Sequence, residues 1–270
     1  MDRLIYTAMT GASQALEQQA VVANNLANTS TTAFRAQLAT FRAVPMNFGD
    51  GTQAATDTTR TFVLASTPGA DFTPGPLQRT GNPLDVAVQG QGWLSVLTAD
   101  GNEAYTRAGN LHVDENGQLV TATNQPVVGN GGPLSVPPGA EVTIGKDGTV
   151  SALIPGDPPT AIAIVDQLKL VNPDPGTLQR GDDGLFRTAD GNPADADPSV
   201  VLAPESLEGS NVNPVTAMVS MITNARQFQM QTKLLESADQ NEQAANQLLN
   251  FSCGRCGVSY AALPSSFSQA

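Results

Sequence analysis

Both ends of the chain carry apolar residues that recur at alternating three- and four-residue steps. This spacing places the residues on one face of an α-helix, as a narrow seam that can pack against another helix. The sequence between the two ends shows short alternating runs separated by Gly- and Pro-containing turns instead. Long helices at the ends and β-type sequence between them therefore constrain the possible fold more than any other feature.

The N-terminal seam begins near Leu4 and is interrupted once, by Gln19. Its members are Ile5, Met9, Ala12, Leu16, Ala23 and Leu26. Asn28, Thr29 and Ser30 then end the pattern, because short polar side chains compete with the helix backbone for hydrogen bonds. The pattern predicts a helix over residues 1–29, about 40 Å long.

The C-terminal seam follows a helix-start signal, with Asn213 as the N-cap and Pro214 at the first helical position. Its members include Met218, Ile222, Ala225, Phe228, Leu235 and Leu249. Because two bare helices with small apolar residues are marginal alone, we expect copies of related subunits to complete both seams. An ordinary hairpin between the two helices of one molecule stays open as the alternative.

Residues 77–210 read as a series of short strands, with Asp-Gly and Asn-Gly turns spaced about 8 to 12 residues apart. The sequence therefore predicts an α+β fold, in which residues 1–29 and 211–252 form a coiled-coil-like stem. Residues 30–76 are expected to be an extended or irregular connector, and residues 77–210 an all-β domain. Residues 253–270 are a tail of unknown role.

The charge balance limits the kinds of partner. The chain has 25 acidic and 13 basic residues, and a net charge of −12. This argues against binding nucleic acid, which requires Lys and Arg to neutralise phosphates, and against docking on an anionic membrane surface. The sequence has no run of about 20 apolar residues, so no membrane-spanning helix is predicted. The N-terminus lacks the apolar block of a cleaved secretory signal, so we expect retention inside the cell or export by a route that reads no such signal.

Reactive residues are few, and no catalytic, cofactor-binding or metal site is predicted. The single His, His112, lies in a Leu-His-Val strand, where a structural role is favoured over a Ser-His-Asp triad. Cys253 and Cys256 lie in the tail, away from the further ligands that zinc requires. The sequence therefore predicts a non-enzyme, with a hydrolase built around His112 as a less favoured alternative.

Four motifs occur in order along the chain: Ala23–Asn28 with Ala33–Arg35, Asn82–Trp93, Tyr105–Leu111 and Glu208–Val215. Together they resemble the signatures of the flagellar basal-body rod and hook protein family, and Phe41–Pro45 and Asp182–Arg187 resemble its proximal-rod members. The signature residues are Asn24, Asn25, Asn28, Phe34, Asn82, Pro83, Asp85, Gly90, Gly92, Asn211, Asn213 and Pro214.

The resemblance implies a structural subunit of the proximal rod of the flagellar basal body, which polymerises helically through its terminal helices. The helices would form an inner tube around the export channel, within a drive shaft that crosses the periplasm. The implied partners are itself, other proximal and distal rod subunits, and the flagellar type III export apparatus, without a cleaved signal and without direct membrane insertion. The alternative is a secreted β-rich adhesin or binding module whose helices oligomerise it.

Under this resemblance the two helical seams become the subunit interface. Asn24, Asn25 and Asn28 would bridge backbone groups where the first helix turns into the Phe34 segment, or else would be solvated residues at the helix end. The terminal helices would be disordered before assembly, because folding only on docking prevents premature polymerisation.

Overall fold

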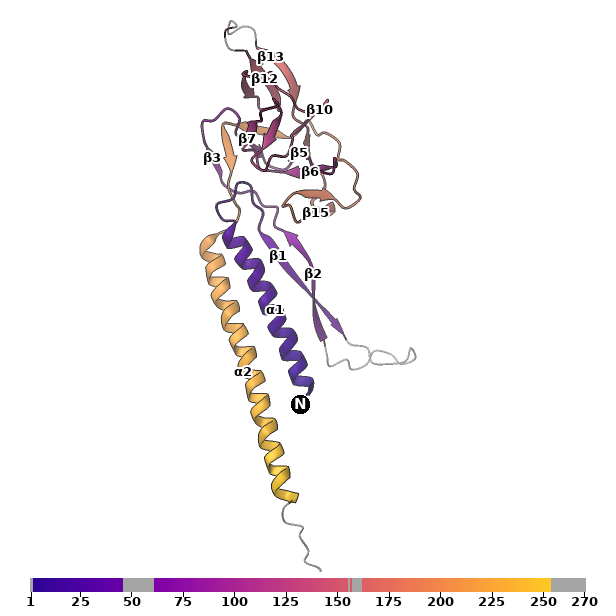
Figure 1. The fold of residues 1–270 in the computed structure, drawn as a ribbon, viewed down its shortest axis with the longest axis vertical. Coiled ribbons are helices and arrows are strands. Elements are labelled where there is room, and N and C mark those ends of the chain that lie inside the picture. Colours follow the sequence, from indigo (N-terminus) through magenta and orange to yellow (C-terminus); the bar gives the residue numbers. More distant parts are fainter. Residues whose placement is uncertain (1, 46–60, 155, 157–161, 254–270) are drawn as a thin grey trace, which may run out of the picture. The chain divides into compact units, whose positions relative to one another are not determined.

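The computed structural model describes residues 2–45, 61–154, 156 and 162–253. The chain divides into two compact units. Unit 1 comprises Met1–Leu16, Ala43–Val63 and Asn224–Ala270, and unit 2 comprises Glu17–Arg42 and Leu64–Thr223. Helices α1 (Asp2–Ala27) and α2 (Pro214–Cys253) lie at the two ends of the chain, with a β-rich region between them in sequence (Figure 1).

The strands share an extended backbone and are mostly short. In chain order they are β1 (Gln37–Pro45), β2 (Thr61–Ala70), β3 (Leu77–Arg79), β4 (Val86–Gln89), β5 (Trp93–Leu97), β6 (Glu103–Thr106), β7 (Leu111–Val113), β8 (Leu119–Thr121), β9 (Val128–Gly129), β10 (Gly132–Pro133), β11 (Glu141–Ile144), β12 (Thr149–Leu153), β13 (Ala163–Gln167), β14 (Leu170–Val171), β15 (Leu178–Arg180), β16 (Phe186–Thr188), β17 (Val201–Pro204) and β18 (Ser206–Glu208). A single 3₁₀ turn, η1 (Pro175–Thr177), precedes β15.

Antiparallel pairing organises the strands from β3 to β18. The largest sheet has five strands in the order β14-β5-β6-β16-β15, and a three-stranded sheet has the order β11-β12-β13. Two-stranded sheets pair β17 with β4, β18 with β3, β7 with β8 and β10 with β9. The hairpin turns predicted from Asp-Gly and Asn-Gly are confirmed, since their glycines have positive φ: Gly101 (79°), Gly117 (78°) and Gly148 (82°).

Two apolar clusters fill the β region. The larger one takes its fully buried members from many strands, among them Val86, Leu94, Val96, Leu119 and Val150. The smaller one is aromatic and contains Trp93, Tyr105 and Phe186, with Phe72 packed against it. The ring centroids of Trp93 and Phe186 lie 4.7 Å apart, within the range that favours aromatic pairs. The β region therefore buries large side chains without help from another molecule.

The predicted coiled-coil-like stem is wrong. Helix α1 spans 26 residues and α2 spans 40, and several of the large side chains that the seam required are exposed. Met9, Leu16, Met218 and Ile222 are 51–55% exposed, whereas the buried residues on the two helices are small or polar: Ala8, Ala15, Ala217, Asn224 and Ala238. Hydrophobic spacing located apolar positions on each helix, but it did not distinguish the enclosed side from the exposed side.

The segment predicted as an extended or irregular connector contains regular structure. Strands β1 and β2 lie inside residues 30–76 and pair as a two-stranded sheet. The one local prediction that fails here is a turn at Thr67-Pro68-Gly69, which the Pro-Gly pair suggested. In the structure these three residues lie within β2, as extended backbone.

Helix α2 begins where the sequence indicated. The Oδ1 atom of Asn213 accepts hydrogen bonds from the backbone N–H groups of Val215 (3.0 Å) and Thr216 (3.2 Å). This satisfies two of the amides that a helix N-terminus leaves free, so the predicted N-cap is confirmed. Neither of the two described helices is long and apolar enough to cross a membrane.

Candidate functional site: a buried junction of three segments

Three charged side chains from distant parts of the sequence meet inside unit 2. Arg35 follows the end of α1, Arg107 follows β6, and Glu208 ends β18. Their side chains are 0%, 4% and 0% exposed, respectively. Oε1 of Glu208 lies 2.7 Å from Nη2 of Arg35, and Oε2 accepts a hydrogen bond from Nε of Arg107 at 2.8 Å. One carboxylate therefore joins the N-terminal, central and C-terminal segments.

Arg107 also holds the turn that connects β4 to β5. Its guanidinium donates to the carbonyl oxygens of Val88 (3.0 Å), Gly90 (2.8 Å) and Gly92 (3.1 Å). Gly92 has a φ of 129°, and a Cβ atom there would lie 2.6 Å from a methyl group of Val200. Burial lowers the pKa of Arg107, the charge of Glu208 opposes this shift, and the charge of Arg35 adds to it. This turn therefore explains why the Asn82–Trp93 motif has glycine at Gly90 and Gly92.

Arg35 is less completely satisfied than Arg107. Its Nη2 atom lies at ion-pair distance from Glu208, but the N–H group is not aimed at the carboxylate oxygen and forms no hydrogen bond. The Nε and Nη1 atoms are also buried without a hydrogen-bond partner in the described part of the chain. Charge attraction, rather than well-formed hydrogen bonds, therefore holds Arg35 in place. Buried donors without partners are costly, so its position depends on Glu208.

Further hydrogen bonds from Glu208 extend the junction. Its Oε1 atom accepts from the backbone N–H of Gly75 at 2.8 Å. Its backbone carbonyl accepts from the N–H of Ala33, also at 2.8 Å. Ala33 has a φ of 55°, a conformation that non-glycine residues rarely adopt, at the point where the chain leaves α1. Glu208 thus fixes the chain on both sides of the Phe34 segment.

The side chains of two asparagines form hydrogen bonds with backbone groups in the same region. Asn25 donates to the carbonyl of Gln37 (2.9 Å) and accepts from its N–H (2.8 Å). Asn211 accepts from the N–H of Ala36 (2.7 Å) and donates to the carbonyl of Asp71 (2.9 Å). The expected bridge from the helix end to the Phe34 segment is therefore made by Asn25.

The other two asparagines of the N-terminal motif bond locally. Asn28 donates to the carbonyl of Asn24 at 2.9 Å, inside the last turn of α1, and accepts from the hydroxyl of Thr31 at 3.0 Å. The Oδ1 atom of Asn24 receives only a long contact of 3.5 Å from Asn28. The helix-end alternative thus describes Asn28, and Asn24 remains exposed.

The remaining signature residues lie around the junction or begin α2. Asn82 donates to Oδ1 of Asp85 at 3.1 Å and closes the turn that contains Pro83. Phe34 is buried, and the guanidinium of Arg180 lies 4.7 Å from its ring centroid. Asn213 and Pro214 start α2, as described above.

Sequence reasoning missed the ion cluster. Arg35, Arg107 and Glu208 entered the prediction only as members of the Ala33–Arg35, Tyr105–Leu111 and Glu208–Val215 motifs. The available signal was one charged side chain inside each of three separate motifs.

The predicted interface residues do not share one enclosed face. Met9, Leu16, Ala23, Met218 and Ile222 are exposed, whereas Ala12, Leu26, Ala225, Phe228 and Leu235 are partly buried. Ile5 belongs to α1 and Leu249 to α2, but their side chains lie outside the described residues.

Side chains suited to catalysis or metal binding do not cluster in the part of the chain that the structure describes. His112 is exposed on β7, where it pairs with Val120 across the hairpin. No group of three or more His, Cys, Asp or Glu side chains is placed to hold a metal ion among these residues. The side chain of Cys253 and the whole of Cys256 lie outside them. The best-defined feature among the described residues is therefore the junction.

Comparison with known families gives the class of protein, since three segments match models of flagellar rod and hook proteins. Residues 5–35 match the family "Flagella basal body rod protein", residues 87–152 match "Flagellar hook protein FlgE/F/G D1 domain", and residues 203–248 match "Flagellar basal body rod FlgEFG protein C-terminal". Arg35, Arg107 and Glu208 each lie in a different one of these segments. The junction therefore joins the three parts that identify the family.

Similar proteins cover nearly the whole chain. The flagellar basal-body rod protein FlgF of Salmonella typhimurium is 57% identical over 258 residues, covering 93% of this chain and 100% of the relative. FlgF of Escherichia coli K12 is 54% identical with the same coverage. FlgG of Buchnera aphidicola from Schizaphis graminum is 34% identical over 84% of this chain and 92% of the relative. The chain belongs to the family of flagellar basal-body rod proteins.

Proposed function

We propose that the chain is a structural subunit of the proximal rod of the bacterial flagellar basal body, polymerising helically with itself and with other rod subunits. The observation that carries this proposal is the similarity to FlgF proteins over 93% of the chain. The family assembles as the rod of the basal body, so this chain is located there. It has a structural rather than an enzymatic role, and it binds neither nucleic acid nor the membrane interior.

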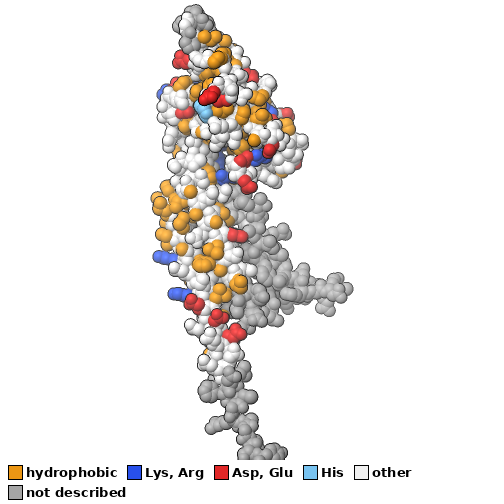
Figure 2. Space-filling model, in the orientation of Figure 1, with side chains coloured by type: hydrophobic (Ala, Val, Ile, Leu, Met, Phe, Trp, Pro, Cys, Tyr) orange, Lys and Arg blue, Asp and Glu red, His pale blue; other side chains and the backbone are white. Residues whose placement is uncertain are grey.

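An exposed apolar stripe on α2 supports assembly with neighbours. Four large apolar side chains, each more than half exposed, lie at i, i+3, i+4 and i+7 on one side of the first turns of the helix; we call them the outer α2 face: Val215, Met218, Val219 and Ile222. Figure 2 shows hydrophobic side chains gathered along this helix. Contiguous apolar surface of this kind indicates an interaction site, so neighbouring subunits cover the outer α2 face in the rod.

The regions of the chain have different roles in this proposal. Residues 1–29 and 211–252 form the inner part of the rod around the export channel, and residues 77–210 form its outer domain. Residues 30–76 connect the two, and no role is assigned to residues 253–270. The subunit is exported by the flagellar type III apparatus without a cleaved signal. The matched families are rod and hook proteins, which gives no support to the adhesin alternative.

The experiment expresses the chain in a Salmonella typhimurium strain that lacks FlgF. The unchanged chain is expected to restore swimming and complete rods. Ile222→Asp places a charge on the outer α2 face, where docking would bury it, and should reduce rod incorporation more than tenfold. Gln227→Asp, at another exposed position of α2, serves as the matched control and should assemble normally.

Two outcomes would contradict this proposal. If the unchanged chain accumulates in the cell but never enters rods, the function is wrong. If Ile222→Asp and Gln227→Asp assemble equally well, the outer α2 face is not the interface, although the rod function stands.

A further inference from the structure

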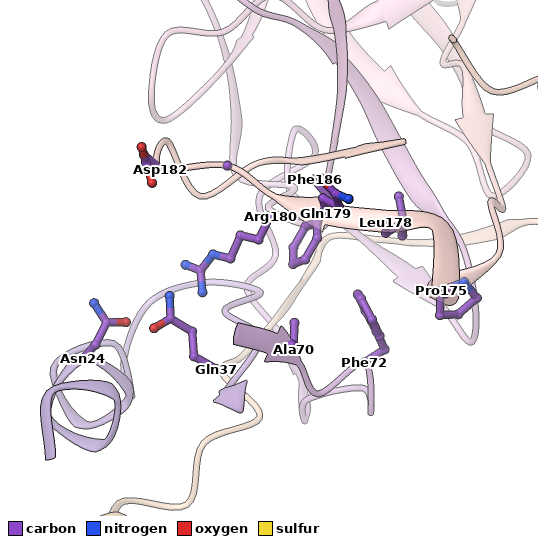
Figure 3. A pocket seen from close by; sticks show the side chains of 13 residues that line it. Asn24, Gln37, Ala70, Phe72, Pro175, Leu178, Gln179, Arg180, Asp182 and Phe186 are labelled. Atoms are coloured by element: carbon purple, nitrogen blue, oxygen red, sulfur yellow. The ribbon is translucent and has the colours of Figure 1, made fainter. Parts of the chain in front are cut away.

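A groove of about 740 Å³ lies in unit 2 between the end of α1 and the β15–β16 hairpin (Figure 3). One side of it is polar and is formed by Asn24, Gln37 and Arg180. The other side is apolar and includes Phe72 and Phe186. This volume is typical of sites that take a small ligand or a few side chains of a partner. We call it the Arg180 groove.

Arg180 is half-buried and has no acidic partner among the residues that the structure describes. Its guanidinium lies over the ring of Phe34, and Nη1 makes a long hydrogen bond of 3.5 Å to the carbonyl of Arg35. Among the residues that the structure describes, no carboxylate forms an ion pair with it. Burial lowers the pKa of Arg180, and no neighbouring negative charge opposes this shift. The groove therefore contains a partly desolvated cation that a carboxylate would stabilise.

Two side-chain amides face the same space. Figure 3 shows the side chains of Asn24 and Gln37 pointing toward the guanidinium of Arg180. Asn25 bonds only to the backbone of Gln37. The side-chain amide of Gln37 has no hydrogen bond within the described residues, so it is available to a carboxylate in the groove. A guanidinium flanked by amide donors is suited to a carboxylate, which accepts several hydrogen bonds at once.

The balance of charge identifies the occupant. The side chains that line the groove include one cation, Arg180, and one carboxylate, Asp182, and these two form no ion pair. Arg180 therefore keeps a positive charge without an ion-pair partner among the described residues, in a chain whose net charge is −12. A second copy of the chain therefore presents an excess of carboxylates to this local positive charge.

We propose that the Arg180 groove binds a carboxylate-bearing segment of a second copy of this chain in the rod. The inference rests on the proposed function, because it requires the subunits to assemble. Arg180 then pairs with the carboxylate, the amides of Asn24 and Gln37 complete its hydrogen bonds, and Phe72 and Phe186 cover the apolar part of the segment. The contact is separate from the outer α2 face and lies beside the buried junction.

The test places a photo-crosslinking amino acid at Gln179, an exposed residue that lines the groove, and isolates rods from cells expressing the chain. Irradiation is expected to join two copies of this chain. Arg180→Gln should lower the yield of this product about tenfold, because a charged hydrogen bond is lost. Arg187→Gln is the matched control, since Arg187 lies on the same hairpin but already pairs with Asp183, and its yield should not change.

The remaining outcomes separate the two proposals. Rods that form normally but give no crosslink, or a crosslink only to another protein, overturn the groove and leave the rod function intact. An equal yield from Arg180→Gln and the unchanged chain does the same. Failure of the unchanged chain to form rods overturns both. If Arg180→Gln does not fold, Arg180→Lys takes its place. Lysine keeps the charge but cannot form the bidentate hydrogen bonds of a guanidinium, so its crosslink yield should be intermediate.

Discussion

The β region and the terminal helices bury different kinds of side chain. The β region encloses Val, Leu, Ile and aromatic side chains, together with an ion cluster that is almost fully buried. The described parts of the two helices enclose mainly alanines and an asparagine, and they leave Met and Ile side chains in solvent. The β region is therefore complete in one molecule, whereas the helices still have apolar surface to bury.

This difference has an energetic consequence. Burying a large apolar side chain contributes about 1.5–3 kcal/mol, and an alanine contributes much less. Helices that lack such burial are marginal in water. Changes in the β region should therefore appear as lost stability of the monomer, and changes on the helices mainly as lost assembly. The predictions below test this division, from the largest expected effect to the smallest.

Removing the carboxylate of the junction should have the largest effect. Glu208→Ala leaves two buried arginines without their shared counter-charge, and breaking a buried ion pair in this way costs about 3–5 kcal/mol. Urea unfolding of the purified monomer measures the loss. Glu205→Ala is the control, because Glu205 pairs with an exposed arginine at the surface and should change stability by less than about 1 kcal/mol. Equal losses from the two variants would show that the junction does not stabilise the β region.

A close approach of two backbones gives the second prediction. A Cβ atom at Gly109 would lie 1.8 Å from the carbonyl oxygen of Val86, which cannot move without disturbing the hydrogen bond from the Val86 N–H to Gly109. Gly109→Ala should therefore cost about 3 kcal/mol or more. Gly101→Ala, at a turn with open space and a φ of 79°, should cost only about 1–2 kcal/mol from conformational strain. Thermal unfolding of both variants measures the difference, and a smaller cost at Gly109 would contradict the close contact.

Much of the β region could be predicted from local sequence. The turns at Gly101, Gly117 and Gly148 depend on residue type at one position, and the N-cap of α2 depends on Asn213. The convergence of Arg35, Arg107 and Glu208 could not be predicted, because it results from pairing between segments 72 to 173 residues apart in the numbering. Only the folded topology brings such residues together.

The helices show the opposite limitation. Their positions in the sequence were clear from periodicity, but their enclosed faces were not. Met9 and Ala8 are neighbours, and the pattern favoured the larger side chain, whereas the structure buries the smaller one. In an assembling protein the large apolar residues can face a partner that a single chain does not contain, so hydrophobic spacing alone does not identify the intramolecular face.

Substitution of Gly11 tests how tightly the helices of unit 1 are packed. A Cβ atom at Gly11 would lie 3.1 Å from Nε2 of Gln231, at the end of a flexible side chain that can move. Alanine is favoured over glycine in a helix by up to about 1 kcal/mol, so Gly11→Ala should raise monomer stability slightly. Circular dichroism with urea unfolding measures both helix content and stability. A clear loss of stability would mean that α1 and α2 are packed as tightly as the β region, and the division drawn above would fail.

A surface ion pair of the β region should have the smallest effect. The hydrogen bond from Arg187 lowers the pKa of Asp183 below its ordinary value of 3.8, so this carboxylate stabilises the fold above that pH. The contribution is lost as the pH falls through the lower pKa of the folded state. Because both side chains are more than a third exposed, the effect should be at most about 0.5 kcal/mol. Asp183→Asn and Arg187→Gln should each flatten the fall in stability by this amount as the pH drops below about 4. Loss of a large part of the acid dependence in either variant would show that surface charge, and not only the buried core and junction, holds the β region together.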